Sequence, residues 1–221
     1  MVHGNTGAGG LKISSMTVEK LLVFVKAPRP GGVKTRLAKS IGAGPACEAY
    51  RQIVTTLLNR LNTLDGVELC YTPEDASAEI QSWLQDGWVT APQREGDLGQ
   101  RLQSAFERSF AAGARRVVII GSDCPEVTAR DVREAWKSLR VRDVVLGPTT
   151  DGGYWLVGLR RVEADLFRKI PWSSEEVFGE TMNRIGQRGL SVQLLRRLAD
   201  VDAESDWRAF LAARKGSEGE R

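Results

Sequence analysis

The sequence LLVFVKAPRPGGVKTRL, residues Leu21 to Leu37, joins a strand to a glycine-rich basic loop. Leu21–Val25 is a continuous apolar run with β-branched residues, which is typical of a strand buried on both faces. Glycines let the backbone approach a ligand closely, and a helix after the loop would present free N–H groups. The loop also carries four basic side chains, so the pattern favours a di- or triphosphate ligand, with an ordinary solvated loop as the alternative.

The spacing of this loop differs from that of two common phosphate-binding motifs. Val33 separates Gly32 from Lys34, so the loop lacks the Gly-Lys-Thr of a Walker A motif. It does not contain Gly-x-Gly-x-x-Gly either. The loop is therefore a candidate phosphate site of another type.

Strand-like and helix-like segments alternate from Lys20 to the end of the chain, which predicts an α/β fold with a mostly parallel sheet covered by helices. No repeat or linker divides the sequence, so we expect a single domain. The expected strands are residues 21–25, 67–71, 88–91, 117–120, 144–147, 154–158 and 192–195. The expected helices are residues 46–61, 76–85, 98–110, 128–139, 173–188 and 206–213, with capping boxes at Thr128/Asp131 and Ser173/Glu176.

Both ends of the chain are expected to lie outside this domain. Residues 1–15 are rich in Gly and Ser and contain no apolar segment, which predicts a disordered leader rather than a signal peptide. Residues 215–221 are polar and are predicted to form a mobile tail. The domain itself is expected to span residues 16–214.

The composition limits the class of protein. The 221 residues are 42% hydrophobic, enough to bury a full core, and a net charge of +3 gives no reason to expect a nucleic-acid partner. The longest apolar run, Leu21–Val25, is far shorter than the ~20 residues of a membrane helix. Cys47, Cys70 and Cys124 lie far apart, which favours reduced thiols and a cytoplasmic location.

The histidine content restricts the chemistry. His3 is the single histidine of the sequence, and it lies in the expected leader. A histidine base, a Ser-His-Asp triad and a histidine-rich metal site are therefore close to excluded. Catalysis would have to rely on carboxylates, Lys, Arg and backbone groups.

Three acidic segments offer such carboxylates. Asp123 lies in GSDCP, where ligands of open α/β sheets bind and where one carboxylate plus substrate phosphates suffices for Mg²⁺; a simple turn is the alternative. Asp151, in TDGGY, could accept hydrogen bonds from hydroxyl groups or merely form a hairpin turn. Residues 200–206, DVDAESD, could supply a second metal ligand or cap the last helix.

Six motifs occur in a recognisable order: FVKAPRPGGVKTRLA, GDLGQRL, VVIIGSDCPEVT, DVVLGPTTDGGYWLVGL, IPWSSEEVF and ADVDAESDW, which together cover roughly residues 20–207. In this order the chain resembles a bacterial family of glycosyltransferase-like proteins with the GT-A nucleotide-diphospho-sugar transferase fold. It is similar, more distantly, to guanylyltransferases that activate phospholactate or the molybdenum cofactor. The resemblance implies a three-layer α/β/α sandwich and a divalent metal, Mg²⁺ or Mn²⁺.

The resemblance also implies roles for individual residues. Lys34 and Arg36 would face the donor phosphates and stabilise the charge that develops there. Asp151 and Gly152 would face the acceptor or the sugar, and Asp151 would orient or deprotonate an acceptor hydroxyl. The other nucleotide-binding positions would be Lys26, Gly31, Gly32, Asp97 and Gly99.

For the metal, the resemblance implies Asp123 as one ligand and Asp202 as the second, with Asp200 in reserve. Two features depart from the family pattern. Ser-Asp-Cys-Pro stands where sugar transferases of this fold usually have Asp-x-Asp, and it is closer to the pattern of nucleotidyltransferases. Ala203 stands where the pattern usually has threonine, and the loss of such a helix cap costs ~1 kcal/mol.

The function expected from these residues is a metal-dependent transferase that moves a sugar from a nucleotide-activated donor to a small-molecule acceptor. The alternative is a nucleotidyltransferase, in which a phosphorylated small molecule attacks a nucleoside triphosphate and needs no base. A non-catalytic nucleotide-binding protein is a further alternative, because a fold alone does not fix function.

Overall fold

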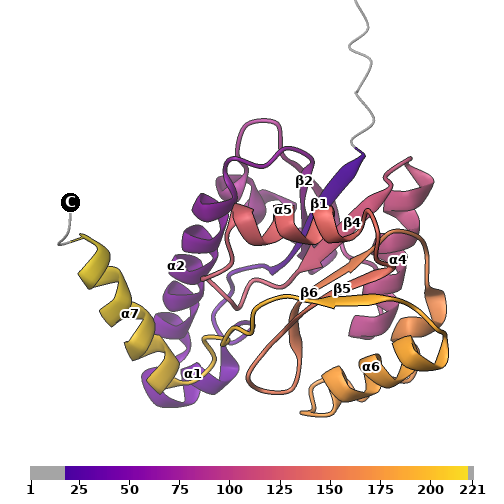
Figure 1. Cartoon of the computed structure of the whole chain (residues 1–221). Helices are drawn as coiled ribbons and strands as arrows, with labels where there is room; N and C mark the ends of the chain where they lie inside the picture. The colour runs from indigo at the N-terminus through magenta and orange to yellow at the C-terminus, as the bar shows by residue number, and fades with distance from the viewer. Residues whose placement is uncertain (1–17, 219–221) are drawn as a thin grey trace, which may run out of the picture.

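A seven-stranded sheet forms the centre of the molecule (Figure 1). The structure is a computed structural model that describes residues 18–218, so the expected leader at residues 1–15 lies outside the described part of the chain. Each apolar run predicted to form a strand does so. The strands are β1 (Glu19–Lys26), β2 (Val67–Thr72), β3 (Val89–Pro92), β4 (Arg116–Ile120), β5 (Val144–Pro148), β6 (Tyr154–Leu159) and β7 (Val192–Leu194).

The strand order is β3-β2-β1-β4-β6-β5-β7, and β6 alone runs antiparallel to its neighbours. All other pairs are parallel, which confirms the expected, mostly parallel sheet. The segments that follow β1, β2, β3 and β4 therefore meet on one side of the sheet, called the carboxyl edge below. Because β6 is reversed and Leu156 pairs with Ile120, β6 brings its first residues, Tyr154 and Trp155, to this same edge.

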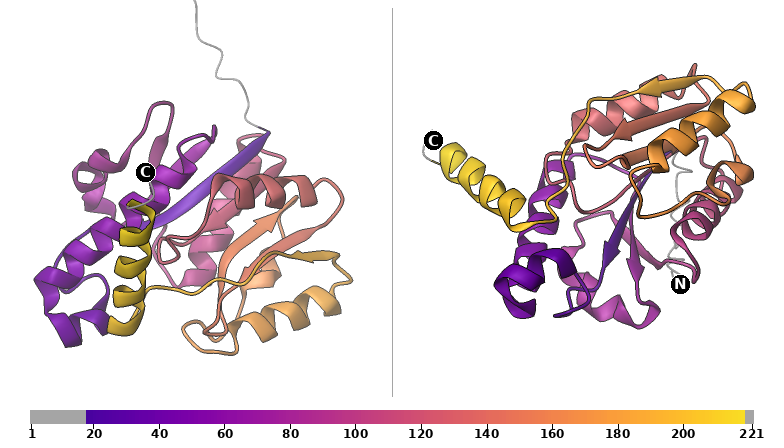
Figure 2. Two further views of the ribbon diagram at one scale, coloured as in Figure 1. Left: turned by 60° about the vertical axis from the view of Figure 1, so that its left-hand side comes forward. Right: turned by 90° about the horizontal axis from the view of Figure 1, so that it is seen from below.

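Helices cover both faces of the sheet, so the domain has three layers (Figure 2). The helices α2 (Ala43–Leu61) and α5 (Ala129–Ser138) lie on one face, and α4 (Leu98–Ala111) and α6 (Val177–Gln187) lie on the other. The short helix α1 (Thr35–Ile41) and the C-terminal α7 (Glu204–Glu218) pack against each other beside α2. Between residues 18 and 218, no helix is both long and apolar enough to cross a membrane.

The central strand β1 explains why two helical layers are required. Leu21 and Val23 pack into the core beneath α2 and α5, whereas Leu22 packs into the core beneath α4. All three side chains are fully buried. Since successive side chains of a strand point to opposite faces, a continuous apolar run has to be covered on both sides.

Two helical regions differ from the sequence-based expectation. Residues 76–85 form three short turns, η1 (Glu74–Ala76), α3 (Ser77–Ile80) and η2 (Gln81–Trp83), in place of one helix. Each turn contributes one anchor to the core, respectively Ala76, Ile80 and Trp83. The helix expected from residue 46 is preceded by α1, because Gly42 with φ 91° ends α1 and starts α2.

The capping box expected at Ser173 and Glu176 is wrong, although the one at Thr128 and Asp131 is formed. Ser173 has φ 69°, whereas a capping residue normally has an extended backbone. The helix α6 therefore begins only at Val177, without a side-chain cap. The last helix is longer than expected, because α7 includes residues 215–218 of the expected tail.

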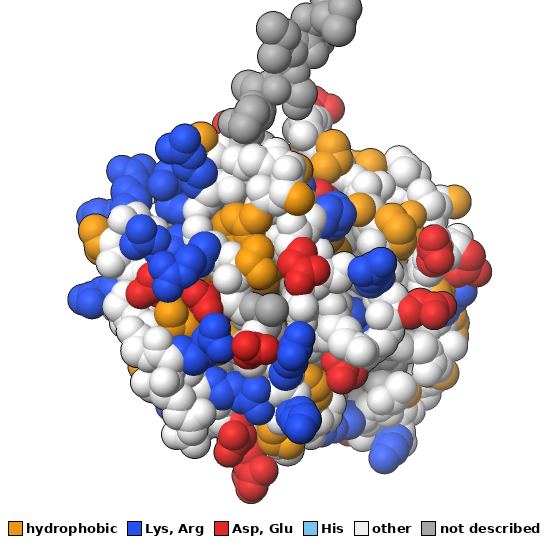
Figure 3. Space-filling model, turned by 90° about the vertical axis from the view of Figure 1, so that its right-hand side faces the viewer, with side chains coloured by type: hydrophobic (Ala, Val, Ile, Leu, Met, Phe, Trp, Pro, Cys, Tyr) orange, Lys and Arg blue, Asp and Glu red, His pale blue; other side chains and the backbone are white. Residues whose placement is uncertain are grey.

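Ion pairs hold the segment between β6 and α6, which contains η3 (Ala164–Phe167). Arg188, directly after α6, lies 3.3 Å from Glu163 and 3.1 Å from Asp165. Arg161 also contacts Glu163, at 2.7 Å. Figure 3 shows basic and acidic side chains next to one another on this side of the molecule. The charges there neutralise each other locally.

A further ion-pair cluster lies between the sheet and α4. Glu68 on β2 is 3% exposed and contacts Lys20 Nζ at 2.6 Å and Arg108 Nη2 at 2.5 Å. Burial alone would raise the pKa of Glu68, but hydrogen bonds from Arg108 and Lys20 hold it below its ordinary value. The carboxylate therefore joins β1, β2 and α4.

We predict that Glu68→Gln lowers the free energy of unfolding at pH 7 by about 2–4 kcal/mol, because two cations lose their buried partner. The pKa of Glu68 is lower in the folded than in the unfolded chain, so its contribution exists at neutral pH and disappears as the pH falls through the folded-state pKa. Urea unfolding of parent and variant at neutral and acidic pH measures both effects. Glu107→Gln on the exposed side of α4 is the control. If Glu68→Gln still lowered the free energy of unfolding at acidic pH, the stabilising role assigned to the ionised Glu68 carboxylate would be wrong.

Candidate functional site

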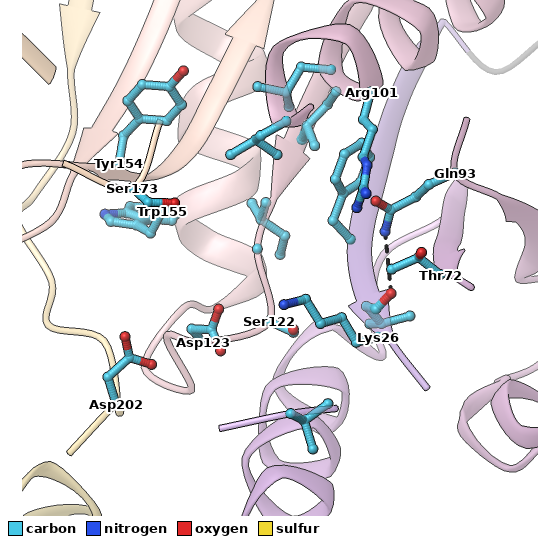
Figure 4. A pocket seen from close by; sticks show the side chains of 18 of the residues that line it. Lys26, Thr72, Gln93, Arg101, Ser122, Asp123, Tyr154, Trp155, Ser173 and Asp202 are labelled. Atoms are coloured by element: carbon cyan, nitrogen blue, oxygen red, sulfur yellow. Dashed lines mark hydrogen bonds between the residues drawn. The ribbon is translucent and has the colours of Figure 1, made fainter. Parts of the chain in front are cut away.

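A cavity of about 580 Å³ opens at the carboxyl edge of the sheet. Its volume lies within the ~300–1,000 Å³ that is usual for small-molecule sites. Its wall combines the ends of parallel strands, the beginning of β6 and parts of α1 and α4. The wall residues labelled in Figure 4 are Lys26, Thr72, Gln93, Arg101, Ser122, Asp123, Tyr154, Trp155, Ser173 and Asp202.

Lys34 lies between the two aspartates that were expected to bind a metal. Its Nζ donates hydrogen bonds to Asp123 and, at 3.0 Å, to Asp202 Oδ1. The Lys34 side chain is 2% exposed, whereas those of Asp123 and Asp202 are 48% and 38% exposed. Burial alone would lower the pKa of Lys34, but the two carboxylates outweigh burial and hold it above its ordinary value. The structure thus brings three predicted site residues to one point.

The backbone positions Lys34 and Asp123. Gly31, with φ 80°, and Gly32 form the turn that leads to Lys34, but neither glycine lines the cavity. Lys34 itself has a left-handed backbone, with φ 47°, directly before α1. The N–H of Val201 donates to the Asp123 carbonyl at 3.0 Å and so attaches the C-terminal segment to the end of β4.

Asp206 organises the segment that carries Asp202. Its Oδ2 accepts hydrogen bonds from the N–H groups of Asp202, at 3.1 Å, and of Ala203, at 2.7 Å. Asp206 therefore satisfies the two N–H groups that directly precede α7. A threonine at position 203 would instead accept from N–H groups within the first turn of α7, so Asp206 does not replace that cap.

Asp200, the reserve candidate for the second metal ligand, contacts Cys124. Its Oδ1 accepts a hydrogen bond from Cys124 Sγ at 2.7 Å. Burial, more than any other effect, raises the pKa of Asp200 to about 6, and the carboxylates of Asp123 and Asp202 add to the shift. Of the two candidates for second metal ligand, the structure places Asp202 beside Asp123 and directs Asp200 towards a buried thiol.

Tyr50 on α2 lines the cavity and links two of its strands by hydrogen bonds. The sequence had not predicted this role. The buried Oη of Tyr50 accepts a hydrogen bond from the N–H of Lys26 at 2.9 Å and shares one with Ser122 Oγ at 3.0 Å. Burial raises the pKa of Tyr50, so the phenol remains neutral. One hydroxyl group therefore fixes the end of β1 relative to the end of β4.

Basic side chains outnumber acidic ones on the cavity wall. Arg36 is exposed, and its Nη1 lies 3.8 Å from Asp202 Oδ2. Arg101 donates through Nε to the Gly96 carbonyl at 2.9 Å, which fixes the base of its guanidinium group. The basic wall residues are Lys26, Lys34, Arg36 and Arg101, against Asp123 and Asp202. This excess of positive charge suits an anionic ligand.

Asp97 and Gly99, expected beside the nucleotide, do not line the cavity. Asp97 caps α4 by accepting a hydrogen bond from the Gln100 N–H at 2.8 Å. Gly99 is required by packing, since a Cβ at this position would lie 2.4 Å from the carbonyl oxygen of Phe167. Both residues determine where α4 begins and so where Arg101 stands.

Asp151 and Gly152 lie in the turn between β5 and β6, outside the cavity wall. Asp151 Oδ1 accepts hydrogen bonds from Thr149 Oγ1 and from the Gly153 N–H, as the hairpin interpretation requires. Gly152 has φ 90°, and a Cβ there would lie 2.2 Å from the carbonyl oxygen of Glu175. This close approach positions the loop before α6.

Asp123 and Asp202 fit a divalent cation. The ammonium group of Lys34 already lies between them, so the position stabilises a positive charge. Across residues 18–218, no group of three or more His, Cys, Asp or Glu side chains is arranged to hold a metal. Mg²⁺ commonly uses one or two carboxylates together with substrate phosphates. The pair is therefore sufficient when a nucleotide supplies the remaining ligands and Lys34 moves aside.

Several wall residues were not expected from the sequence. Arg101 lies in GDLGQRL and Ser173 in IPWSSEEVF, whereas Gln93 lies three residues before GDLGQRL. The motifs therefore contained a signal without distinguishing wall residues from packing residues. Gln93 is fixed by its own amide, which donates to the backbone carbonyls of Cys70 at 2.7 Å and of Val25 at 3.3 Å.

Comparison with protein families gives one match. Residues 57–174 match the family described as "Uncharacterized protein conserved in bacteria (DUF2064)". No curated protein matches the chain in sequence.

Solved structures share the fold. A Desulfovibrio desulfuricans G20 protein, itself proposed to be a nucleotide-diphospho-sugar transferase, is 36% identical, with a TM-score of 0.79 over 85% of this chain and 83% of its own. This similarity confirms the fold that the six motifs implied.

Two more distant structures resemble this chain in fold alone. CMP:2-keto-3-deoxy-manno-octonic acid synthetase, solved with CTP, is 12% identical, with a TM-score of 0.59 over 91% of this chain and 100% of its own. Rv0371c from Mycobacterium tuberculosis H37Rv, solved with manganese, is 17% identical, with a TM-score of 0.51 over 89% of this chain and 100% of its own.

We predict that Lys34→Met raises the affinity for Mn²⁺ in the absence of nucleotide by about tenfold, because it removes the cation that competes for the two carboxylates; tenfold corresponds to ~1.4 kcal/mol. The same change should weaken binding of a nucleoside diphosphate. Calorimetric titration with Mn²⁺ alone and with the diphosphate alone measures the two effects separately.

Arg36→Met is the matched control, since it removes an exposed charge without vacating the space between Asp123 and Asp202. It should change the affinity for Mn²⁺ much less than Lys34→Met does. Unchanged Mn²⁺ binding in Lys34→Met would show that the two carboxylates do not form the metal site.

Proposed function

This chain belongs to the bacterial DUF2064 family, and we propose that it is a metal-dependent transferase with a nucleotide-activated sugar as donor and a small molecule as acceptor. The observation that carries the proposal is the meeting of Lys34, Asp123 and Asp202 in a cavity with an excess of basic side chains. The similarity to the Desulfovibrio protein supports the same class of donor.

The donor diphosphate is proposed to lie against Lys34 and Arg36. Both cations stabilise the negative charge that accumulates on the diphosphate as the bond to the sugar breaks. Mg²⁺ or Mn²⁺, held by Asp123 and Asp202, would add charge neutralisation at the leaving group. With the metal on these carboxylates, the Lys34 ammonium group is free to pair with a phosphate oxygen.

The acceptor hydroxyl has to lose a proton in this reaction. Asp123 and Asp202 are committed to a cation in the cavity, so neither is a suitable base. Asp151 is the proposed base: it lies outside the cavity wall, but its charge helps to raise the pKa of Asp200, two residues before Asp202. Its Oδ1 is held by Thr149 and Gly153, while Oδ2 has no hydrogen-bond partner among the described residues. A fixed carboxylate can orient an acceptor and accept its proton.

A second candidate function is nucleotidyl transfer. Asp123 and Asp202 are the carboxylates of the cavity wall, and both face Lys34, so the wall itself offers no spare base. A phosphorylated substrate is already ionised and needs none. The synthetase of the same fold that was solved with CTP has a nucleoside triphosphate as its ligand.

Product analysis separates these functions. The full chain with Mn²⁺ is incubated with nucleotide-sugars or with nucleoside triphosphates and candidate acceptors. Release of a nucleoside diphosphate supports the proposed sugar transfer, and release of pyrophosphate supports the second candidate. Binding of nucleotides without either product would overturn both and leave a nucleotide-binding protein.

We predict that Asp151→Asn lowers kcat by about 100-fold or more and leaves donor binding nearly unchanged, because general bases typically contribute 10²–10⁴-fold. Turnover at saturating substrates is the decisive measurement. A near-normal kcat would remove Asp151 from the chemistry and favour nucleotidyl transfer.

A further inference from the structure

We propose that the cavity wall formed by β6 and Ser173 binds the uncharged sugar of the donor, and that Ser173 is the specificity-determining residue of this subsite. The inference rests on the proposed function and adds the chemical class of the transferred group. It depends on the distribution of charge in the cavity, on the backbone of Ser173 and on the hydrogen-bonding state of its hydroxyl.

Charge is distributed unevenly around the cavity. Every basic wall residue comes from the end of β1, from the residue before α1, from the first turn of α1 or from α4. The wall contributed by β6 and Ser173 carries no charged side chain. Figure 4 shows Tyr154, Trp155 and Ser173 on one side of the cavity, with Lys26 and Arg101 on the other. An ionised group at the β6 wall would lose water without gaining a counter-charge, which disfavours it. A neutral polyhydroxyl group avoids this cost.

The backbone of Ser173 is held in an unfavourable conformation. Ser173, with φ 69°, is one of three non-glycine residues with positive φ in the described part of the chain. Such backbones are energetically unfavourable and persist where the surrounding structure imposes them. Here the N–H of Phe178 donates to the Gly152 carbonyl at 2.8 Å, and the backbone of Glu175 packs directly on Gly152. These contacts hold the loop so that Ser173 stands at the cavity wall.

The two neighbouring serines differ in what their hydroxyl groups do. Ser174 Oγ donates to the Pro171 carbonyl at 2.8 Å and accepts from the Glu176 N–H at 3.3 Å, so it is used within the loop. Ser173 Oγ has no hydrogen-bond partner among residues 18–218, and its side chain is exposed at the cavity. The Ser173 hydroxyl can therefore both donate to and accept from a sugar hydroxyl.

The test compares nucleoside diphosphates with the matching nucleoside diphosphate hexoses. Calorimetry is done on the full chain with saturating Mn²⁺, using the uridine, guanosine, cytidine and adenosine compounds. The parent should bind the hexose form of its preferred nucleotide more tightly than the diphosphate, and the hexuronate form should show no such gain. Ser173→Ala should reduce the gain by about 3–10-fold, as expected for one neutral hydrogen bond, without changing the affinity for the diphosphate.

Two further variants distinguish the effect of the Ser173 hydroxyl from the effect of its backbone conformation. Ser173→Gly, which relieves the left-handed strain, should lose the gain to the same extent as Ser173→Ala. Ser174→Ala should keep the parent's ratio of affinities, even if it destabilises the loop.

Three results would overturn the inference. They are equal affinities of the parent for hexose and diphosphate, a hexuronate that binds as tightly as the hexose, and a Ser173→Gly variant that retains the full gain. Each leaves the proposed function intact, because the diphosphate still binds. Failure of every diphosphate to bind would overturn the proposed function itself, and this inference with it.

Discussion

The contact of one buried ammonium group with two carboxylates determines which segments meet at the carboxyl edge of the sheet. Lys34 belongs to the loop after β1, Asp123 to the loop after β4 and Asp202 to the segment before α7. A lysine with only 2% of its side chain exposed requires nearby negative charge, so the three segments have to converge. The same two carboxylates are the proposed ligands of the metal ion, and the proposal requires Lys34 to exchange them for a phosphate group.

The topology of the sheet adds a chemical asymmetry to this edge. Parallel strands end at the edge, and the loops after them carry most of its charged groups. The reversed strand β6 instead presents its beginning there, and Tyr154 and Trp155 belong to a strand whose other residues are buried in the core. A neutral aromatic wall opposite a charged one therefore follows from the direction of a single strand.

Much of the fold could be predicted because local patterns and tertiary packing agree. The apolar run at Leu21–Val25 and the capping box at Thr128 each have one stable solution, and the structure adopts it. At Ser173 the local sequence pattern and the tertiary packing conflict. The local sequence resembles a cap, but contact of the following residues with Gly152 forces a left-handed backbone that cannot cap a helix. No local pattern contains that contact, since its partners belong to different segments of the chain.

Some residues of the candidate site could likewise be predicted from the sequence, and others could not. Lys34 and Asp123 could be chosen from residue type and position after strands, and Asp202 from the family resemblance; the structure places the three together. Asp97 and Gly99 belong to an equally distinctive motif, but their residue types are explained by a helix cap and by close packing. The sequence does not predict the role of Tyr50, because a buried tyrosine in an apolar helical stripe has the same sequence pattern as any core residue.

The wide separation of Lys34 and Asp202, 168 positions apart in the chain, has a consequence for biosynthesis. As the chain is synthesised, the segments up to β4 are complete long before Asp202 is made. Until then Lys34 has Asp123 alone as a partner. A ribosome-bound or prematurely terminated chain could therefore form most of the sheet while the Lys34 ammonium group still has one carboxylate partner in place of two.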